Sequence, residues 1–269
     1  METKQQAEAG DAEAQNKLGV TYYNGQDVPQ DYKEAVKWFT KAAEQGLADA
    51  QFNLGVMYDN GQGVPQDYAE AVKWYTKAAE QGDSGSQFDL GAMYYSGQGV
   101  PQDYAEAVKW YTKAVEQGFA GAQLNLGVMY YNGQGVPQDY AEAVKWYTKA
   151  AEQGVADAQN KLGAMYHNGQ GVPQDYTEAV KWYTKAAEWG LADAQNNLGV
   201  ACSKLDRYQD AVEAHKQAIK IKPDYVEAHY NLGAAYLTAG DKNSALEEYE
   251  TLKTLDAEQA NKLFNLINK

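Results

Sequence analysis

A stretch of 36 residues that recurs along the chain constrains the fold more than any other feature of the sequence. A chain with this kind of self-similarity folds as a solenoid, in which each unit buries its apolar face only against its neighbours. Two shorter copies follow from about Ala192 and Val226, at a spacing of 34 residues. The longer copies begin at Gly10, Gly46, Gly82, Gly118 and Gly154.

The first half of each repeat predicts an α-helix of about three turns. In residues 48–60, Ala50, Leu54 and Met57 recur at helical spacing and form an apolar stripe. The helix is expected to end at Gly61, since glycine adopts the left-handed conformation that closes a last turn.

The second half of each repeat predicts another helix, which begins after a short loop. Pro65 cannot continue the first helix, and Asp67 stands three residues before Glu70. That spacing is typical of a helix N-cap whose partner acid bonds back to the cap. The second helix is expected to run to about Gln81, so one repeat is an antiparallel helix pair.

Three motifs recur in register: L-G-x-x-Y in the first helix, G-x-G-V-x-x-D-Y in the loop and A-x-x-W-Y-x-K-A-A in the second helix. From Gly10 to about Glu188 they closely resemble the Sel-one-like repeat, a longer-looped relative of the tetratricopeptide repeat. The resemblance implies an all-α fold, an α-solenoid of tandem antiparallel helix pairs wound as a right-handed superhelix. It also implies a role in assembling protein complexes.

The last two repeats lack the G-x-G-V-P loop and resemble ordinary tetratricopeptide repeats. The predicted organisation is a frayed leader over residues 1–9, five Sel-one-like repeats over 10–189, two tetratricopeptide repeats over 190–259 and a capping helix over 260–269. In that cap, Leu263, Phe264 and Ile267 are expected to face inward. Trp189 replaces a glutamine of the other repeats at the change of repeat type, and we interpret it as filler for an altered junction. The residues that carry the second resemblance are Leu198, Gly199, Ala211, Ala218, Pro223, Leu232, Gly233, Tyr236, Ala245 and Tyr249.

Composition narrows the classes of partner. A net charge of −14 opposes binding to nucleic acid or to anionic membranes. The single cysteine, Cys202, excludes an intramolecular disulfide framework. No apolar run is long enough for a signal peptide or a membrane span. The sequence therefore predicts a cytoplasmic chain as written, or a periplasmic or secreted one if a signal peptide has been removed, which is a monomer or a weak dimer.

Two positions of the first helix vary from repeat to repeat while the second helix hardly changes. They lie about two helical turns apart on one face, and by resemblance to tetratricopeptide proteins that face lines a concave groove where peptides bind. The aromatic and apolar members are expected to supply buried area to a bound peptide, and the asparagines to bond its backbone. Neutral variation of solvent-facing residues is the alternative. The predicted groove residues are Asn16, Tyr23, Phe52, Asp59, Phe88, Tyr95, Leu124, Tyr131, Asn160, His167 and Asn196.

The other residues that could carry out chemistry are expected to have structural roles rather than catalytic or metal-binding ones. The Asp and Glu pairs at each second-helix start, Asp67 and Glu70 among them, are expected to be capping groups rather than an acid–base pair. His167, His215 and His229 lack the spacing of metal ligands. Cys202 and His215 fall at core positions, which favours a buried, inert thiol over a nucleophile pair.

The sequence thus predicts a non-enzymatic protein-interaction scaffold, without cofactor or metal, that binds a peptide or helical segment of a protein in its groove. Two alternatives stay open. One is an engineered or chimeric repeat array with no evolved ligand, which the near-identity of the repeats and the abrupt change at Trp189 allow. The other is a hydrolase related to cysteine-rich, β-lactamase-like repeat proteins, although their regularly paired cysteines are absent here.

Overall fold

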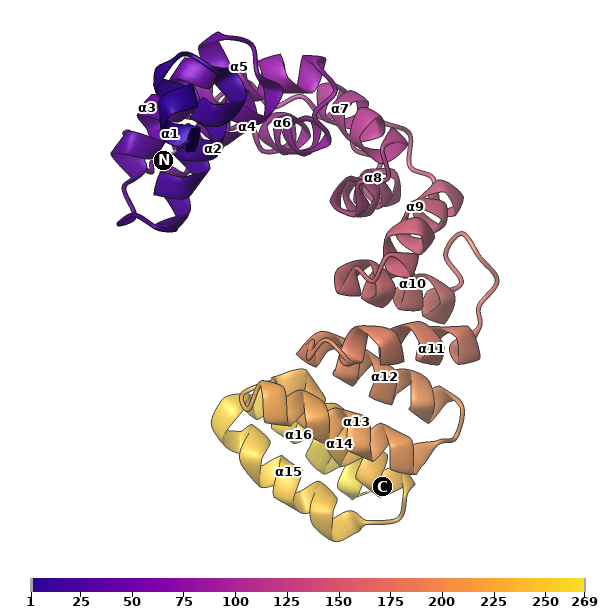
Figure 1. Ribbon diagram of the computed structural model, residues 1–269. Helices are drawn as coiled ribbons and strands as arrows, with labels where there is room; N and C mark the ends of the chain where they lie inside the picture. Colours follow the sequence, from indigo (N-terminus) through magenta and orange to yellow (C-terminus); the bar gives the residue numbers. More distant parts are fainter. Residues whose placement is uncertain (1, 269) are drawn as a thin grey trace. The chain divides into compact units, whose positions relative to one another are not determined.

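The computed structural model describes residues 2–268, and all sixteen elements in that range are α-helices (Figure 1). The chain divides into two compact units, one up to Gln138 and one from Asp139 onwards. The all-α fold of tandem helix pairs is therefore confirmed.

In the first unit, the first helices of the repeats are α2, α4, α6 and α8, and the second helices are α3, α5 and α7. Each second helix packs against the first helix before it and the first helix after it. The bounds are α1 Glu2–Glu8, α2 Ala12–Asn24, α3 Tyr32–Glu44, α4 Ala48–Asn60, α5 Tyr68–Glu80, α6 Ser84–Ser96, α7 Tyr104–Glu116 and α8 Ala120–Asn132.

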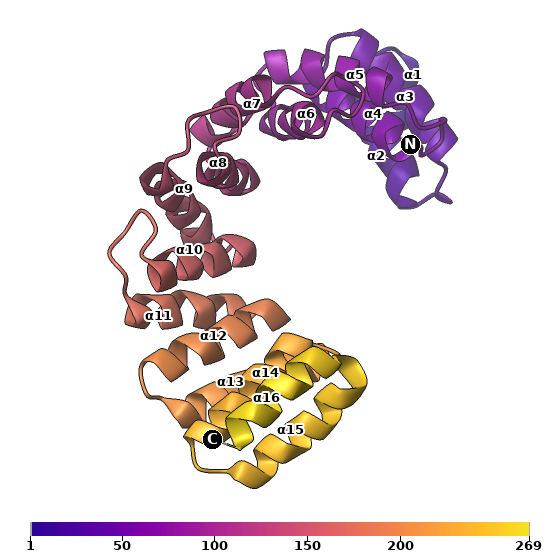
Figure 2. The same cartoon turned by 180° about the vertical axis from the view of Figure 1, so that it is seen from behind.

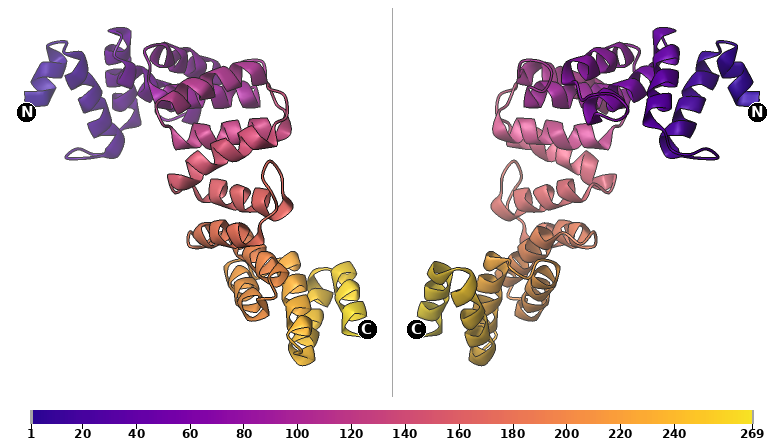
Figure 3. Two further views of the ribbon diagram at one scale, coloured as in Figure 1. Left: turned by 90° about the vertical axis from the view of Figure 1, so that its right-hand side faces the viewer. Right: turned by 90° about the vertical axis from the view of Figure 1, so that its left-hand side faces the viewer.

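The second unit repeats this alternation, as Figure 3 shows from two further sides. Its last helix, α16, packs against both α14 and α15 (Figure 2). The bounds are α9 Tyr140–Glu152, α10 Ala156–Asn168, α11 Tyr176–Ala187, α12 Ala192–Lys204, α13 Tyr208–Ile221, α14 Val226–Thr238, α15 Lys242–Leu255 and α16 Ala257–Ile267.

The carboxylates at the second-helix starts are caps, as predicted, but the reciprocal bond of a capping box is not formed. Oδ1 of Asp67 accepts hydrogen bonds from the backbone N–H groups of Ala69 and Glu70 at 3.0 and 3.1 Å. The backbone N–H of Asp67 donates to the carbonyl of Tyr58 instead. Glu70 is therefore free to pair with Lys73, 3.0 Å away on the solvent side.

The longer Sel-one-like loop packs onto the repeat before it. Gly63 has φ +74°, and a Cβ atom there would lie 2.3 Å from the carbonyl oxygen of Tyr32 at the start of α3. Only glycine fits a backbone approach this close. The second glycine of G-x-G-V thus anchors the loop to the preceding second helix at Gly63, Gly99, Gly135 and Gly171, whereas the first loop has Asp27 at this position.

A glycine and an aromatic ring define the centre of each helix pair. A Cβ atom on Gly55 of α4 would lie 2.6 Å from the ring of Tyr75 on α5, which is 1% exposed. The same contact joins Gly91 to Tyr111 and, in the second unit, Gly199 to His215. Because the ring lies directly on the helix backbone, no residue larger than glycine fits at this position without a shift of the ring.

Both predicted ends differ from the structure. Residues 2–8 form helix α1 rather than a frayed leader, because buried Ala7 packs against Ala14 and Leu18 of α2. The capping helix begins at Ala257, three residues earlier than expected. Leu263 and Ile267 are buried as predicted, whereas Phe264 is 43% exposed and lies against Tyr249.

A ladder of buried glutamines ties successive helices together in the first unit. Gln51 donates to the carbonyl of Ala43 at 3.2 Å and accepts a bond from Gln81 at 2.7 Å. Gln15 with Gln45, and Gln87 with Gln117, make the same bonds. In the second unit Gln159 donates to Ala151, but its Oε1 is buried without a partner. Trp189 stands where the donor would be.

Trp189 is therefore not filler: its side chain is 66% exposed. We expect Trp189→Gln to stabilise the second unit by about 1 kcal/mol, because the new amide can donate a hydrogen bond to the unsatisfied Oε1 of Gln159. Urea titration of both proteins measures the difference. Trp189→Ala, which removes the indole without adding a donor, is the control, and equal stability of the two variants would contradict this explanation.

Candidate functional site

The predicted groove residues lie on the first helices of the repeats, and ten of the eleven are partly buried. The exception is Asn196, which is 1% exposed. In each unit an aromatic ring of a second helix lines a cavity between two first helices: Phe39 between α2 and α4, and His215 between α12 and α14. The site is described separately for each unit.

A cavity lies between two neighbouring first helices in each unit. In the first unit a cavity of about 380 Å³ lies between α2 and α4. Tyr23 and Phe52, both predicted groove residues, line it together with Asn53, and Phe39 of α3 contributes to its wall. An apolar cavity with a few polar groups is typical of a binding site.

The aromatic groove residues of the first unit are held by second-helix rings. The ring of Phe52 lies 6.0 Å from that of Tyr75, and the ring of Phe88 lies 5.8 Å from Tyr111 and 4.9 Å from Phe119. Tyr95 packs in the same way against Tyr104 at 5.3 Å. These contacts fix the rings before any ligand binds, which lowers the entropy lost on binding.

Tyr23 and His167 make the equivalent contact in their own units, with Tyr32 at 5.4 Å and with Tyr176 at 5.1 Å. Burial, followed by the charge of Lys204, lowers the pKa of His167. Leu124 and Tyr131 are partly buried on α8.

The predicted asparagines are engaged with a neighbouring column of residues that sequence reasoning missed. Asn53 donates to Oδ1 of Asn16 at 3.0 Å, and Asn197 donates to Oδ1 of Asn160 at 3.1 Å. The donor stands one residue after the predicted column. The signal for it was in the sequence, since this position also varies between repeats, although it holds fewer residue types than the predicted positions. It holds Lys17, Asn53, Asp89, Asn125, Lys161, Asn197 and Asn231.

Asn196 has a structural role. Its Oδ1 accepts from Nδ1 of His215 at 3.0 Å and from Asn231 at 3.1 Å. Burial lowers the pKa of His215 to about 4, so the ring is neutral at physiological pH and its remaining proton serves this bond. Asn196 thus joins α12 to α13 and α14, and its side chain is not exposed to a ligand.

Asp59 of α4 and Asp89 of α6 influence each other electrostatically, and both act on Tyr75 of α5. The hydroxyl of Tyr75 donates to Oδ2 of Asp59 at 3.4 Å. Burial raises the pKa of Asp59. Burial, then the charges of Asp59 and Asp83, raise the pKa of Asp89 to about 6. Burial, then the charges of Asp89 and Asp59, raise the pKa of Tyr75. This is the most strongly perturbed group of side chains along the predicted groove.

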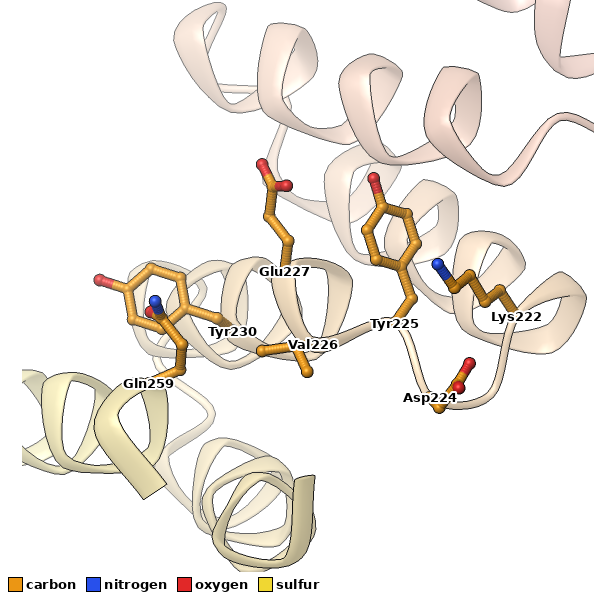
Figure 4. A pocket seen from close by; sticks show the side chains of 7 residues that line it. All are labelled: Lys222, Asp224, Tyr225, Val226, Glu227, Tyr230 and Gln259. Atoms are coloured by element: carbon orange, nitrogen blue, oxygen red, sulfur yellow. The ribbon is translucent and has the colours of Figure 1, made fainter. Parts of the chain in front are cut away.

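Two cavities lie among helices α12 to α16 of the second unit. One, of about 320 Å³, lies between α12 and α14 and is lined by Ser203, Lys204, His215 and Asn231 among others. The other, of about 390 Å³, is shown in Figure 4: it lies where α13, α14 and α16 meet, with Tyr225 and Tyr230 on its walls.

The other chemically capable residues considered in the sequence, His229 and Cys202, are buried in the core. Nδ1 of His229 lies 2.6 Å from a carboxylate oxygen of Glu248 and Nε2 lies 2.8 Å from the carbonyl of Pro223. The bond to Glu248 raises the pKa of His229. Burial raises the pKa of the Cys202 thiol, which is 1% exposed. Cys202 is therefore protonated at neutral pH, as expected for an inert thiol.

The comparison with protein families agrees with the repeat motifs. The Sel1 repeat family matches residues 12–47, 48–83, 84–119, 120–155 and 156–190. Residues 201–240 match a TPR repeat, and residues 226–259 match a tetratricopeptide repeat. The chain belongs to the Sel1 repeat family, with tetratricopeptide repeats after the Sel1 array.

Solved structures resemble it along most of its length. A protective antigen of uropathogenic Escherichia coli with an SLR fold is 34% identical, with a TM-score of 0.74, over 96% of this chain and 64% of that chain. A Sel1 repeat protein from Oxalobacter formigenes is 36% identical, with a TM-score of 0.68, over 77% of this chain and 84% of that one. The Hsp70–Hsp90 organizing protein of Triticum aestivum is 38% identical over 56 residues, which are 21% of this chain and 10% of that protein.

Arrays of such repeats present extended surfaces to other proteins. The repeat family to which the chain belongs typically serves as a protein-interaction scaffold. Within residues 2–268 the helices are too short or too polar for any of them to cross a lipid bilayer.

Proposed function

We propose that the chain is a non-enzymatic scaffold that binds an extended or helical peptide segment of a partner protein along the first helices of its repeats. In the first unit the binding groove is formed by α2, α4, α6 and α8. The observation that carries the proposal is the cavity of about 380 Å³ between α2 and α4. Its lining includes Tyr23 and Phe52, two positions that vary between otherwise similar repeats.

The side chains along this groove suit peptide recognition. Phe52 and Phe88 present partly exposed rings that their second-helix neighbours hold in place. Aromatic side chains in such positions supply much of the binding free energy at protein interfaces. The asparagine amides beside them offer donors and acceptors to a peptide backbone. Neither Cys202 nor His215, both buried, is placed to attack a substrate.

The test uses the intact chain and a random-peptide phage library as the probe. We expect it to select peptides that bind the Phe52→Ala/Phe88→Ala variant about tenfold or more weakly than they bind the intact chain. Each substitution removes an aromatic ring that contributes about 1–2 kcal/mol of binding free energy. Lys37→Ala/Lys73→Ala, on the exposed face of the second helices, is the matched control and should bind normally. Helicity of each variant is checked by circular dichroism.

Two results would overturn the proposal. Selected peptides that bind the ring variant as tightly as the intact chain would place the binding surface elsewhere. Failure to select any peptide would favour the alternative of a repeat array without an evolved ligand.

A further inference from the structure

Asp59 and Asp89 occupy repeat positions that line a cavity elsewhere in the chain. The two equivalent positions hold Tyr23 and Asn53 in the cavity between α2 and α4. They hold Ser203 and Asn231 in the cavity between α12 and α14 of the second unit. The two carboxylates therefore lie on the groove wall between α4 and α6, at positions that hold neutral groups in both of those cavities.

This pair has no cationic partner within the described part of the chain. None of the ion pairs formed by residues 2–268 includes Asp59 or Asp89. The bond from Tyr75 to Asp59 is long, at 3.4 Å, and a neutral hydroxyl does not offset two negative charges. Two like charges held in a partly buried wall are unfavourable until a cation neutralises them.

The surroundings favour an organic cation. Phe52 lies beside Tyr75, and Phe88 stands immediately before Asp89 on α6. Aromatic faces next to carboxylates attract a guanidinium or an alkylammonium group through cation–π contacts. No third carboxylate, histidine or cysteine joins the pair to make a metal-binding group within the described residues. The carboxylates thus complement a basic side chain better than a divalent ion.

We propose that the groove between α4 and α6 binds an arginine or lysine side chain of the partner peptide, held between Asp59 and Asp89 and flanked by Phe52 and Phe88. This inference rests on the peptide-binding function proposed above and adds a sequence preference to it. An arginine fits best, because its planar group offers donors to both carboxylates at once.

The experiment compares peptides selected from the phage library on the intact chain. We expect the selected sequences to share a basic residue, and replacement of that arginine by uncharged citrulline to weaken binding about tenfold. Asp59→Asn/Asp89→Asn should bind the arginine and citrulline peptides equally. Asp49→Asn, an exposed carboxylate at the start of α4, is the control for the general attraction of an acidic chain to basic peptides and should keep the preference.

The outcomes separate this inference from the proposed function. Selected peptides that need Phe52 and Phe88 but carry no basic residue would overturn the basic-residue preference alone. Basic peptides that bind the Asp59→Asn/Asp89→Asn variant as well as they bind the intact chain would also overturn it, since bulk charge would then explain them. Peptides that bind regardless of the two rings, or no selected peptide at all, would remove the proposed function and this inference with it.

Discussion

Tyr111→Ala is expected to destabilise the first unit by about 3–5 kcal/mol, the usual cost of removing a buried aromatic ring. Tyr111 is 1% exposed and lies on the backbone of Gly91, where a Cβ atom would be 2.8 Å from its ring. The cavity left by the ring cannot close, because α6 and α7 are each held by a further helix. Urea denaturation followed by circular dichroism measures the loss.

Tyr111→Phe is the matched control and should cost about 1 kcal/mol or less. Burial raises the pKa of Tyr111 to about 12, and the hydroxyl has Asn125 as its neighbour, so the substitution removes one hydrogen bond and leaves the ring. The first repeat already carries phenylalanine, Phe39, at the equivalent position, 2% exposed over Gly19. Equal losses for the two variants would show that the hydroxyl, and not the ring, holds the helices together.

The fold was predictable because the same helix-pair pattern recurs from repeat to repeat along the sequence. The spacing of Leu54, Met57 and their copies gives the first helix, and the Asp–x–x–Glu pairs locate the start of the second. Five independent copies of one pattern make an accidental match improbable. The termini were less predictable, because α1 and α16 have no second copy in the chain and their packing depends on contacts with α2 and with α14 and α15 that no repeat pattern reports.

The groove was predictable only in part. Variation between repeats located Tyr23 and Phe52 correctly on a cavity wall, because that surface is where the repeats differ. It did not distinguish a ligand-facing asparagine from a buried one. Asn196 is buried and bonds to His215, which stands where most repeats have tyrosine, a contact between residues 19 positions apart. Single-sequence patterns do not report such a tertiary contact.

The pair of carboxylates was missed for a related reason. Asp59 entered the prediction as a variable groove position, while Asp89 stood one residue outside the chosen column. Asp59 stands one residue before the end of α4 and Asp89 lies mid-way along α6, and both carboxylates act on Tyr75 of α5. Only the packing of three helices brings these charges together.

Asp89→Asn is expected to stabilise the first unit by up to about 3 kcal/mol above pH 6, while the two proteins converge near pH 4. The folded state raises the pKa of Asp89 from 3.8 to about 6, chiefly through burial. The folded protein therefore binds this proton more tightly than the unfolded chain, and stability falls as the pH rises through that interval. Asparagine fits the site, since Asn53 and Asn125 occupy the same position in the adjacent repeats.

Urea titrations of both proteins at several pH values between about 4 and 8 test this expectation. A stability difference that grows with pH and levels off above about 6 is the expected result. A difference independent of pH would show that the carboxylate of Asp89 is not penalised by its surroundings, and would remove the electrostatic reason for a cation to bind there. If the variant is more stable and also loses the preference for arginine, the chain retains a destabilising charge because its ligand neutralises it.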